Sequence, residues 1–566
     1  MKSSFWQALR PMVLAAALFS VIVNFVLLVP PLYMLQVYDR VLTTRHEETL
    51  WVLTFGALAA LAVSALLDAF RARLLTGAAI VLDRAYGPDL LARLVTERSR
   101  GARGDFAAGL GDFAMVKTFL TSPNVFLLYD VPWFPLFVAL IFLFHPVLGI
   151  VSVVGALVLV LLAVANERVS RRAIDAVRGQ GRAAGRYAEA ALRNAEAVAA
   201  MGMQHAVAAR WRDLSERSFG ALALISERGG AIASASRFWR QALQVLMLGV
   251  GALLVIEQQV TSGAMIAATI VLSRALAPVE MMVGNWRQIV DAWSAMQRLR
   301  RVVDRGAEPA ASFELPTPAG RIAVDGVGLR VPGRDAPLVH GVTFSIEPGE
   351  LLGVVGPSAA GKTTLARLMV GLWKPGIGSV RVDGADVSTW PREQLGRFIG
   401  YVPQDVELFS GTVAENIARL EPPDSPRVIA AAQRARCHDM ILQLPQGYDA
   451  EVGPEGELLT PGQRQRVALA RALYVDLRFA VLDEPNANLD ASGEHALMQA
   501  LRWLKTNGIT TVLITHHPAL LSVVDRLLVM RDGTIARFGP RDEVLAWLSQ
   551  GPRLVRVEPG HTGGTT

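Results

Sequence analysis

The chain has 566 residues, of which 52% are hydrophobic and only 19% are charged. Soluble proteins carry about 25% charged residues, and one core rarely grows past roughly 250–300 residues. The composition therefore indicates a membrane protein of several domains and excludes a disordered or fibrous chain. The net charge of +6 suits either a nucleic-acid partner or basic flanks of membrane helices. The single cysteine, Cys437, cannot form an intrachain disulfide, and we expect a thiol packed inside a domain.

Hydrophobic residues are concentrated in the first half of the chain. A bilayer span takes about 20 helical residues, and six stretches are long enough: 12–36, 50–70, 124–144, 146–166, 239–257 and 262–284. The first stretch is too long for the apolar part of a signal peptide, and no small-residue cleavage site follows it, so we interpret it as a retained span.

Basic residues mark one side of these spans. They precede the first span and follow the second, the fourth and the sixth: Lys2, Arg10, Arg71, Arg73, Arg168, Arg171, Arg172, Arg298, Arg300 and Arg301. Loops on the cytoplasmic side of a membrane carry an excess of Lys and Arg. We therefore expect both termini in the cytoplasm, and the basic charge then needs no nucleic acid.

The segments 71–123 and 167–236 are too long for simple loops and are rich in Ala, Leu, Arg and Glu. We interpret them as helices that extend the spans into the cytoplasm, with a break at 99–105. Beyond them, strand-like runs alternate with helical ones. The predicted division is a transmembrane domain over 1–305, a Pro-containing linker over 306–320, an α/β domain over 321–550 and a disordered tail over 551–566.

A phosphate-binding motif lies at the start of the α/β domain. A buried strand leads into a glycine-rich loop, and a helix follows, which is the context that the motif G-x-x-x-x-G-K-[ST] requires. The residues expected to surround the phosphates of ATP are Gly356, Pro357, Ser358, Ala359, Ala360, Gly361, Lys362, Thr363 and Thr364. Lys362 would reach the β- and γ-phosphates and Thr363 would ligate Mg²⁺. The alternative is a chance glycine-rich turn.

A second acidic element follows 120 residues later. Phe479–Leu482 is an apolar strand that ends in Asp483 and Glu484. We expect Asp483 to hold Mg²⁺ and Glu484 to act as the base for the attacking water. The chain is thus predicted to join an all-α, six-helix transmembrane domain with long cytoplasmic extensions to an α/β P-loop nucleotide-binding domain.

Further motifs resemble the ATP-binding cassette (ABC) family. Leu459-Thr460-Pro461-Gly462-Gln463 is similar to its signature loop, Gln404 to its Q-loop, His516 to its switch histidine, and Asn488-Leu489-Asp490 to its D-loop. The resemblance implies that ATP lies between two head-to-tail domains. The signature loop and Asp490 of one chain would then reach the ATP of the other. Gln404 and His516 would sense the γ-phosphate, and Gln404 would join Thr363 and Asp483 at Mg²⁺.

One cassette per chain implies a dimer, and we expect a homodimer, with a heterodimer as the alternative. The fused spans and cassette and the cytoplasmic helical extensions resemble type I exporters. The segments 31–41, 120–123, 130–135, 263–268 and 273–280 look like the type I secretion permease/ATPases of the PrtD-like protease-exporter branch. That resemblance implies a bacterial inner-membrane location, a periplasmic adaptor, an outer-membrane channel and an unfolded polypeptide substrate. Few residues precede the first span, so no processing of a substrate leader is expected.

Three departures from the family pattern stand out. Thr460 and Pro461 replace the usual Ser and Gly, Val331 replaces an adenine-stacking aromatic, and Ala359 and Ala360 replace Gly and Ser. Two alternatives remain at this point. One is an exporter of lipid or small molecules, and the other is a membrane-anchored regulatory cassette with slow turnover.

Two charged residues, Arg274 and Glu280, lie in or near the last predicted span. Because charges in a membrane are costly, they either contact substrate or lie near the cytoplasmic end and pair with neighbouring chains or water.

Overall fold

The computed structural model describes residues 2–99, 106–305, 315–331 and 336–549. The chain divides into two compact units, one formed by Met1–Val95 with Asp105–Ala307 and the other chiefly by the chain from Glu308 onwards. This division falls inside the range predicted for the linker. Most of that linker and the whole predicted tail, 551–566, lie outside the described residues.

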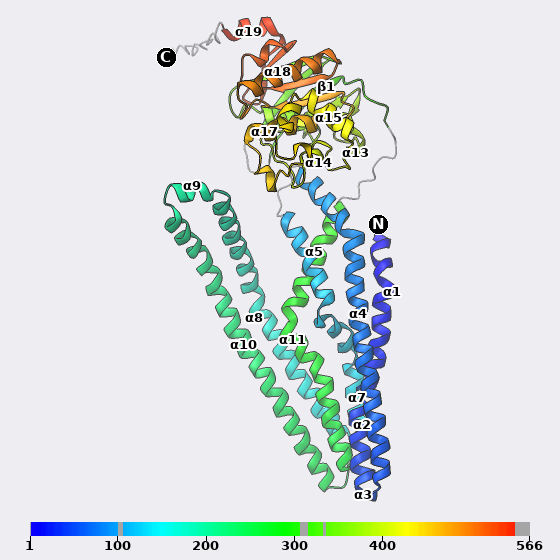
Figure 1. Cartoon of the computed structure of the whole chain (residues 1–566). Helices are drawn as coiled ribbons and strands as arrows, with labels where there is room; N and C mark the ends of the chain where they lie inside the picture. Colours follow the sequence, from blue (N-terminus) through cyan, green and yellow to red (C-terminus); the bar gives the residue numbers. More distant parts are fainter. Residues whose placement is uncertain (1, 100–105, 306–314, 332–335, 550–566) are drawn as a thin grey trace, which may run out of the picture. The chain divides into compact units, whose positions relative to one another are not determined.

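The first unit is entirely helical in its described part (Figure 1). Its elements are α1 (Lys2–Val26), α2 (Val29–Gln36), η1 (Val37–Val41), α3 (Leu42–Thr44), α4 (Glu47–Ser99), α5 (Phe106–Thr121), η2 (Pro123–Phe126), α6 (Leu127–Asp130), η3 (Val131–Trp133), α7 (Phe134–Phe144), α8 (Pro146–Arg193), α9 (Ala195–Ala200), α10 (Gln204–Ile256) and α11 (Ser262–Arg305).

Two predicted spans are not single helices. The first is broken by a turn between α1 and α2, next to Pro30 and Pro31. The third consists of the short elements η2, α6 and η3 followed by α7, with Pro123, Pro132 and Pro135 at the starts of η2, η3 and α7. Proline lacks the N–H that an interior helical residue donates, so each helix has to restart there.

Four helices continue far beyond the length of a span. α4 has 53 residues, α8 has 48, α10 has 53 and α11 has 44. At 1.5 Å per residue these helices are roughly 65–80 Å long, more than twice the hydrocarbon thickness. The helices α8 and α10 run side by side and are joined by the short α9 (Figure 1). The predicted helical extensions are therefore present, and α4 and α5 flank the predicted break at 99–105.

Five helical segments in the described residues are long and apolar enough to cross a membrane: Arg10–Thr44, Glu47–Ser99, Pro123–Phe144, Gly230–Ile256 and Ser262–Trp286. Within the predicted fourth span, the apolar segment found among the described residues is Pro146–Leu162 of α8. The count of six spans thus stays a prediction.

A buried ion pair joins three parts of the helical unit. The Arg71 side chain of α4 is only 7% exposed, and its Nη1 lies 3.1 Å from Oδ1 of Asp130 in α6. Asn24 of α1 donates to the same Asp130 oxygen over 3.0 Å, and the Arg71 Nη1 also donates to the hydroxyl of Ser20 over 2.9 Å. Asp68 completes the group at 2.9 Å from the Arg71 Nη2. Each charge therefore has a partner, as burial requires.

Glu280 has a partner within its own chain that neither of our two interpretations named. Its Oε2 lies 2.7 Å from the Arg240 Nε of α10, so the two helices supply both charges within one chain. Arg274 is exposed on α11.

The second unit contains two sheets (Figure 1). The antiparallel sheet has the order β2-β1-β4-β5, and the larger sheet has the order β10-β9-β3-β8-β7-β6, in which β9, β3, β8, β7 and β6 are parallel. The strands are β1 (Ile322–Leu329), β2 (Val339–Ile346), β3 (Leu351–Val355), β4 (Ile377–Val382), β5 (Ala385–Asp386), β6 (Ile399–Val402), β7 (Phe479–Asp483), β8 (Thr510–Ile514), β9 (Arg526–Arg531) and β10 (Thr534–Pro540).

Helices and turns surround these sheets. They are α12 (Lys362–Met369), α13 (Arg392–Leu395), α14 (Val413–Ile417), α15 (Ser425–Arg434), α16 (His438–Leu442), η4 (Gly447–Asp449), η5 (Pro454–Gly456), α17 (Pro461–Ala472), α18 (Ala491–Thr506), η6 (Leu520–Ser522) and α19 (Arg541–Ser549).

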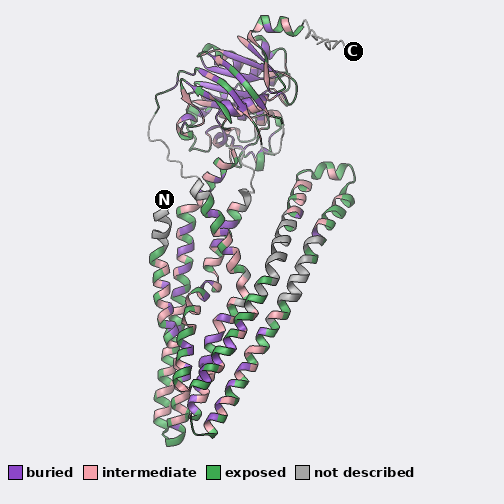
Figure 2. Ribbon diagram, turned by 180° about the vertical axis from the view of Figure 1, so that it is seen from behind, coloured by how far each residue is buried: buried purple, intermediate pink, exposed green. Residues whose placement is uncertain are grey.

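Buried residues concentrate in the strands of the larger sheet (Figure 2). Every residue of β3, β7 and β8 is buried, which explains why their sequences are largely apolar. Cys437 is fully buried as expected, and burial raises the pKa of its thiol to about 12.

Candidate functional site

Parallel strand order positions the predicted site. The strands β6, β7 and β8 are neighbours, with Val402 opposite Leu482 and Asp483 opposite Ile514. Parallel strands end at the same edge of a sheet, and ligands of such sheets bind at that edge. The chain leaving β6 reaches Gln404, the end of β7 supplies Asp483 and Glu484, and the chain leaving β8 reaches His516.

The phosphate loop leaves β3 at this edge. Gly356 has φ 152°, and a Cβ there would lie 2.2 Å from the carbonyl oxygen of Met530, so only glycine fits. Gly361 has φ 97° and caps α12, which begins at Lys362. The predicted strand, loop and helix are therefore present, and the first N–H groups of α12 face the loop as an anion site requires.

Lys362 is held inside the loop. Its Nζ donates to the carbonyl oxygens of Gly356 over 2.8 Å and of Pro357 over 3.0 Å. Burial lowers the pKa of this ammonium group, and the negative charges of Glu484 and Asp483 oppose that shift. The positive charge is thus fixed where phosphate oxygens are expected.

Asp483 has the features of a cation ligand. It is fully buried, and neither carboxylate oxygen has a hydrogen-bond partner in the described part of the chain. Burial raises the pKa of this carboxyl, while the nearby Thr363 hydroxyl and, after it, the charges of Arg367 and Lys362 oppose the shift. The hydroxyl of Thr363 lies 3.5 Å from Oε1 of Gln404. A buried carboxylate beside hydroxyl and amide oxygens is a donor set that fits Mg²⁺.

Glu484 lies between two polar side chains. Its Oε2 accepts from the Gln404 Nε2 over 3.3 Å, and its Oε1 lies 3.4 Å from Nε2 of His516. The Glu484 side chain is 28% exposed, so water can reach it. Its backbone has φ 49°, a left-handed conformation that is uncommon for this residue, and its N–H donates to Ile514 over 2.9 Å.

Two residues that the sequence analysis did not identify hold this arrangement. The hydroxyl of Thr515 donates to Oδ1 of Asn486 over 3.0 Å and accepts from the N–H of His517 over 3.0 Å. Thr515 is fully buried, so this bond ties the segment after Glu484 to the segment that carries His516. The position of the polar Thr515 directly after the strand β8 could have indicated this role in the sequence.

The signature residues form a helix start. The hydroxyl of Thr460 accepts from the Gln463 N–H over 3.3 Å, and the Gln463 Oε1 accepts from the Thr460 N–H over 2.9 Å. This is a capping box, and Pro461 occupies the first helical position of α17 as predicted. The Leu459 side chain is buried, so it contributes to packing rather than to a surface.

The D-loop residues pack beside this helix start. Asp490 caps α18 by accepting from the Gly493 N–H over 2.7 Å, and its Oδ1 also lies 3.0 Å from Nη2 of Arg466 in α17. A Cβ at Gly462 would lie 3.0 Å from the Asn488 carbonyl oxygen.

The structure thus forms two groups of predicted residues, one around Lys362 and Glu484 and one around Thr460 and Asp490. Val331 is half-buried just beyond the end of β1, and no hydrogen bond or ion pair among the described residues places it in either group.

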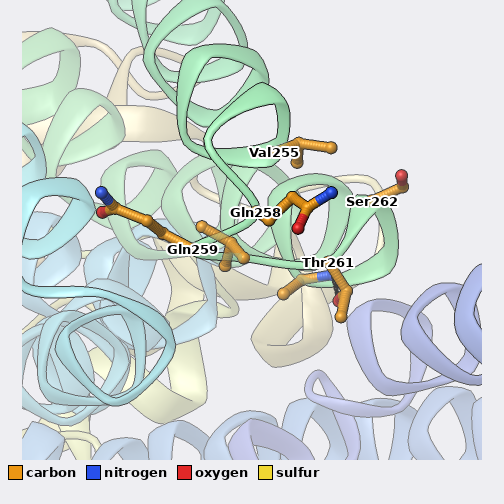
Figure 3. Close-up of a pocket in the computed structure, with 7 residues that line it drawn as sticks. Val255, Gln258, Gln259, Thr261 and Ser262 are labelled. Carbon is orange, nitrogen blue, oxygen red and sulfur yellow. Dashed lines mark hydrogen bonds between the residues drawn. The ribbon is translucent and has the colours of Figure 1, made fainter.

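An open pocket of about 460 Å³ lies elsewhere, at the turn between α10 and α11 (Figure 3). Residues 255, 258–262 and 264 line it, and none of them is titratable. The side chains of Gln258 and Gln259 point away from each other there. The pocket therefore offers no acid or base for catalysis.

Both units match known families. Residues 13–276 match the ABC transporter transmembrane region, and residues 339–487 match the ABC transporter family. A bacterial Atm1-family ABC exporter solved with ATP bound shares the fold, with a TM-score of 0.82, 24% sequence identity, and coverage of 96% of this chain and 98% of that one.

Several relatives that match nearly the whole chain are secretion proteins. The type I secretion system ATP-binding protein PrsD of Rhizobium meliloti is 40% identical over 93% of this chain and 91% of its own length. The cyclolysin secretion/processing ATP-binding protein CyaB of Bordetella pertussis is 31% identical over 96% of this chain and 77% of its own length. The chain therefore belongs to the ABC transporter family and, within it, to the type I secretion system ATP-binding proteins.

Proposed function

We propose that this protein is the ATPase and permease of a type I secretion system and exports an unfolded polypeptide across a bacterial inner membrane. The observation that carries the proposal is the joining, in one chain, of membrane helices to a cassette whose Lys362, Asp483 and Glu484 meet at one sheet edge. The 40% identity to a type I secretion ATP-binding protein over 93% of the chain supports the substrate class.

The residues of the site divide the work of ATP hydrolysis. Lys362 and the N–H groups of the phosphate loop bind the phosphate oxygens. Thr363, Gln404 and Asp483 would hold Mg²⁺, which supplies neutralisation of phosphate charge. Glu484 accepts the proton of the attacking water, and His516 and Gln404 orient its carboxylate through the contacts described above.

A second copy completes the site in this proposal. Thr460, Pro461, Gly462 and Gln463 start a helix whose N-terminus carries partial positive charge, and such an end suits the γ-phosphate bound by a partner chain. The exposed Asp490 would lie at the same interface. We propose a homodimer with both termini and the cassette in the cytoplasm.

The functional partners follow from the same assignment. Type I secretion ATPases generally work with an adaptor and an outer-membrane channel protein. We propose a periplasmic adaptor of this kind, the channel behind it and a secreted polypeptide as partners, in addition to membrane lipid. Nucleic acid is not among them.

Two alternatives are weaker. The relatives that match nearly the whole chain are secretion proteins, so export of lipid or small molecules is not favoured. A slowly turning, regulatory cassette would rest on Thr460 and Pro461 alone, and both residues fit an ordinary helix start.

The experiment compares proteins released by the native bacterium with those released by a strain carrying Glu484→Gln. We expect one or a few proteins to disappear from the medium and to accumulate inside the cell. Affinity purification of the tagged variant should also retain an adaptor protein. An unchanged set of secreted proteins, with the variant present at the wild-type level, would contradict protein secretion.

A further inference from the structure

The polar residues in the apolar part of α11 differ in whether they have a partner within the chain. Ser273 accepts from the Gln244 Nε2 of α10 over 2.6 Å, and Glu280 forms its ion pair with Arg240 of the same helix. Arg274 lies between them, is exposed, and forms no hydrogen bond or ion pair within the described residues. A lone guanidinium group in a spanning helix needs an explanation.

The position of Arg274 makes contact with lipid costly. It lies 12 residues beyond Ser262, the first residue of α11 and of its candidate span. At 1.5 Å per residue that is about 18 Å, near the middle of a hydrocarbon layer of about 30 Å. The neighbouring Val271, Leu272 and Ala275 are fully buried in the helical core. Arg274 is exposed at the edge of this buried face, where a charge requires water or a counter-charge.

A second copy of the chain offers no free carboxylate at this depth. The acidic residues in the apolar parts of the described candidate spans are engaged within their own chain, while Asp83, Asp89 and Glu97 lie in the second half of α4, well beyond Asp68. Asp39 accepts from the Gly263 N–H over 2.9 Å, Asp68 and Asp130 pair with Arg71, and Glu280 pairs with Arg240. Glu47 and Glu48 lie at the very start of α4, at the end of its span.

We infer that Arg274 faces the aqueous translocation path and binds carboxylates of the polypeptide in transit. The inference rests on the proposed export function and adds a specificity-determining residue to it. A guanidinium group presents paired N–H donors that match a carboxylate, and a dimer would place two such groups along the path. The site would favour acidic over neutral segments of an unfolded chain.

The first test measures whether water reaches this position. Arg274→Cys in lipid nanodiscs is treated with a positively charged methanethiosulfonate reagent, which reacts with thiolates in water. Val245→Cys is the matched control, because Val245 is 73% exposed on α10 and lies 11 residues, about 17 Å, before the helix end at Ile256. The native Cys437 is fully buried with a pKa raised to about 12, so it gives little background.

The second test measures binding of two unfolded Gly- and Ser-rich peptides of equal length. One carries glutamates at regular intervals, and the other carries glutamines at the same positions. We expect the wild-type chain to bind the acidic peptide about threefold to tenfold more tightly and Arg274→Gln to lose that preference. Arg274→Lys should retain part of it, since the charge remains.

The outcomes separate this inference from the export function. Rapid labelling at position 274 but not at 245, together with the lost acidic preference, supports the inference. Absence of labelling at 274 would place the side chain against lipid or the second chain and overturn it. A wild-type chain without acidic preference, or one whose preference survives Arg274→Gln, would also overturn it. The comparison of secreted proteins between the native strain and the Glu484→Gln strain tests the export function independently of these results.

Discussion

Gln404 donates its side-chain amide to Glu484 over 3.3 Å, although 80 residues separate them in the sequence. The same Gln404 places its amide oxygen 3.5 Å from the hydroxyl of Thr363. One side chain therefore contacts both the residue proposed to hold Mg²⁺ and the residue proposed to activate water. A movement of the segment that carries Gln404 would therefore change the contacts of both Thr363 and Glu484.

Glu484→Gln tests the base directly. The amide cannot accept the proton of the attacking water, so we expect turnover to fall by about 10²–10⁴-fold. ATP binding should persist, because Lys362 and the phosphate loop are untouched. The measurements are the ATPase rate in lipid and ATP affinity by calorimetry. Retention of more than about a third of the wild-type rate would remove Glu484 from this role.

Lys362→Ala tests the phosphate loop. The substitution removes a buried ammonium group that the loop carbonyls hold in place, and with it a charge-assisted contact to phosphate. We expect ATP affinity to fall by about tenfold or more, in line with the ~1.5–3 kcal/mol of such a bond. Calorimetry on the full chain in nanodiscs measures it, with Lys374→Ala as a control for loss of a lysine outside the loop. Equal affinity in the wild type and Lys362→Ala would make our interpretation of the loop wrong.

Arg71→Met tests the buried ion pair of the helical unit. The variant leaves the Asp130 carboxylate without its charged partner, which costs about 3–5 kcal/mol when a pair is buried. We expect a clear loss of thermal stability in detergent. Lys117→Met is the matched control, because its partner Asp83 is 53% exposed and such pairs contribute about 0–1 kcal/mol.

A second substitution checks the origin of that loss. Combining Arg71→Met with Asp130→Asn removes both charges, so the double variant should be more stable than the sum of the two single losses predicts. Strict additivity would mean that Arg71 acts through its packing on Phe126, whose ring centroid lies 4.0 Å from the guanidinium carbon.

The segments of the candidate site can be located from the sequence. Lys362 and His516 follow buried strands of one parallel sheet and Asp483 ends another, so strand order alone brings their segments to one edge. The partners of isolated charges, in contrast, could not be predicted from the sequence. Arg71 and Asp130 are 59 residues apart on helices whose packing no local pattern specifies, and Glu280 finds Arg240 on another helix. The restarts at prolines could have been predicted, because Pro30 and Pro132 interrupt apolar stretches that a hydropathy window treats as continuous.

The helix start at Pro461 yields the last prediction. The capping box uses the N–H groups of Thr460 and Gln463, and proline at the first helical position has none, which leaves the N–H of Gly462 in the first turn. In the proposed dimer this end faces the γ-phosphate of the partner chain. A donor to a charged oxygen is worth about 1.5–3 kcal/mol where the bond is made. We therefore expect the wild-type chain to hydrolyse ATP slowly and Pro461→Gly to raise the rate several-fold in nanodiscs.

Pro461→Ala separates the donor from loop flexibility. Alanine restores the N–H as glycine does but keeps the helix start ordered, because glycine costs about 1 kcal/mol more in a helix. If the missing donor limits closure, both variants should be faster than the wild type, and alanine at least as fast as glycine. A gain for glycine alone would assign the effect to flexibility. Equal or lower rates in both would show that this position never needs an N–H, because the capping box and Gly462 already provide what the phosphate requires, and the expectation of slow turnover would then be wrong.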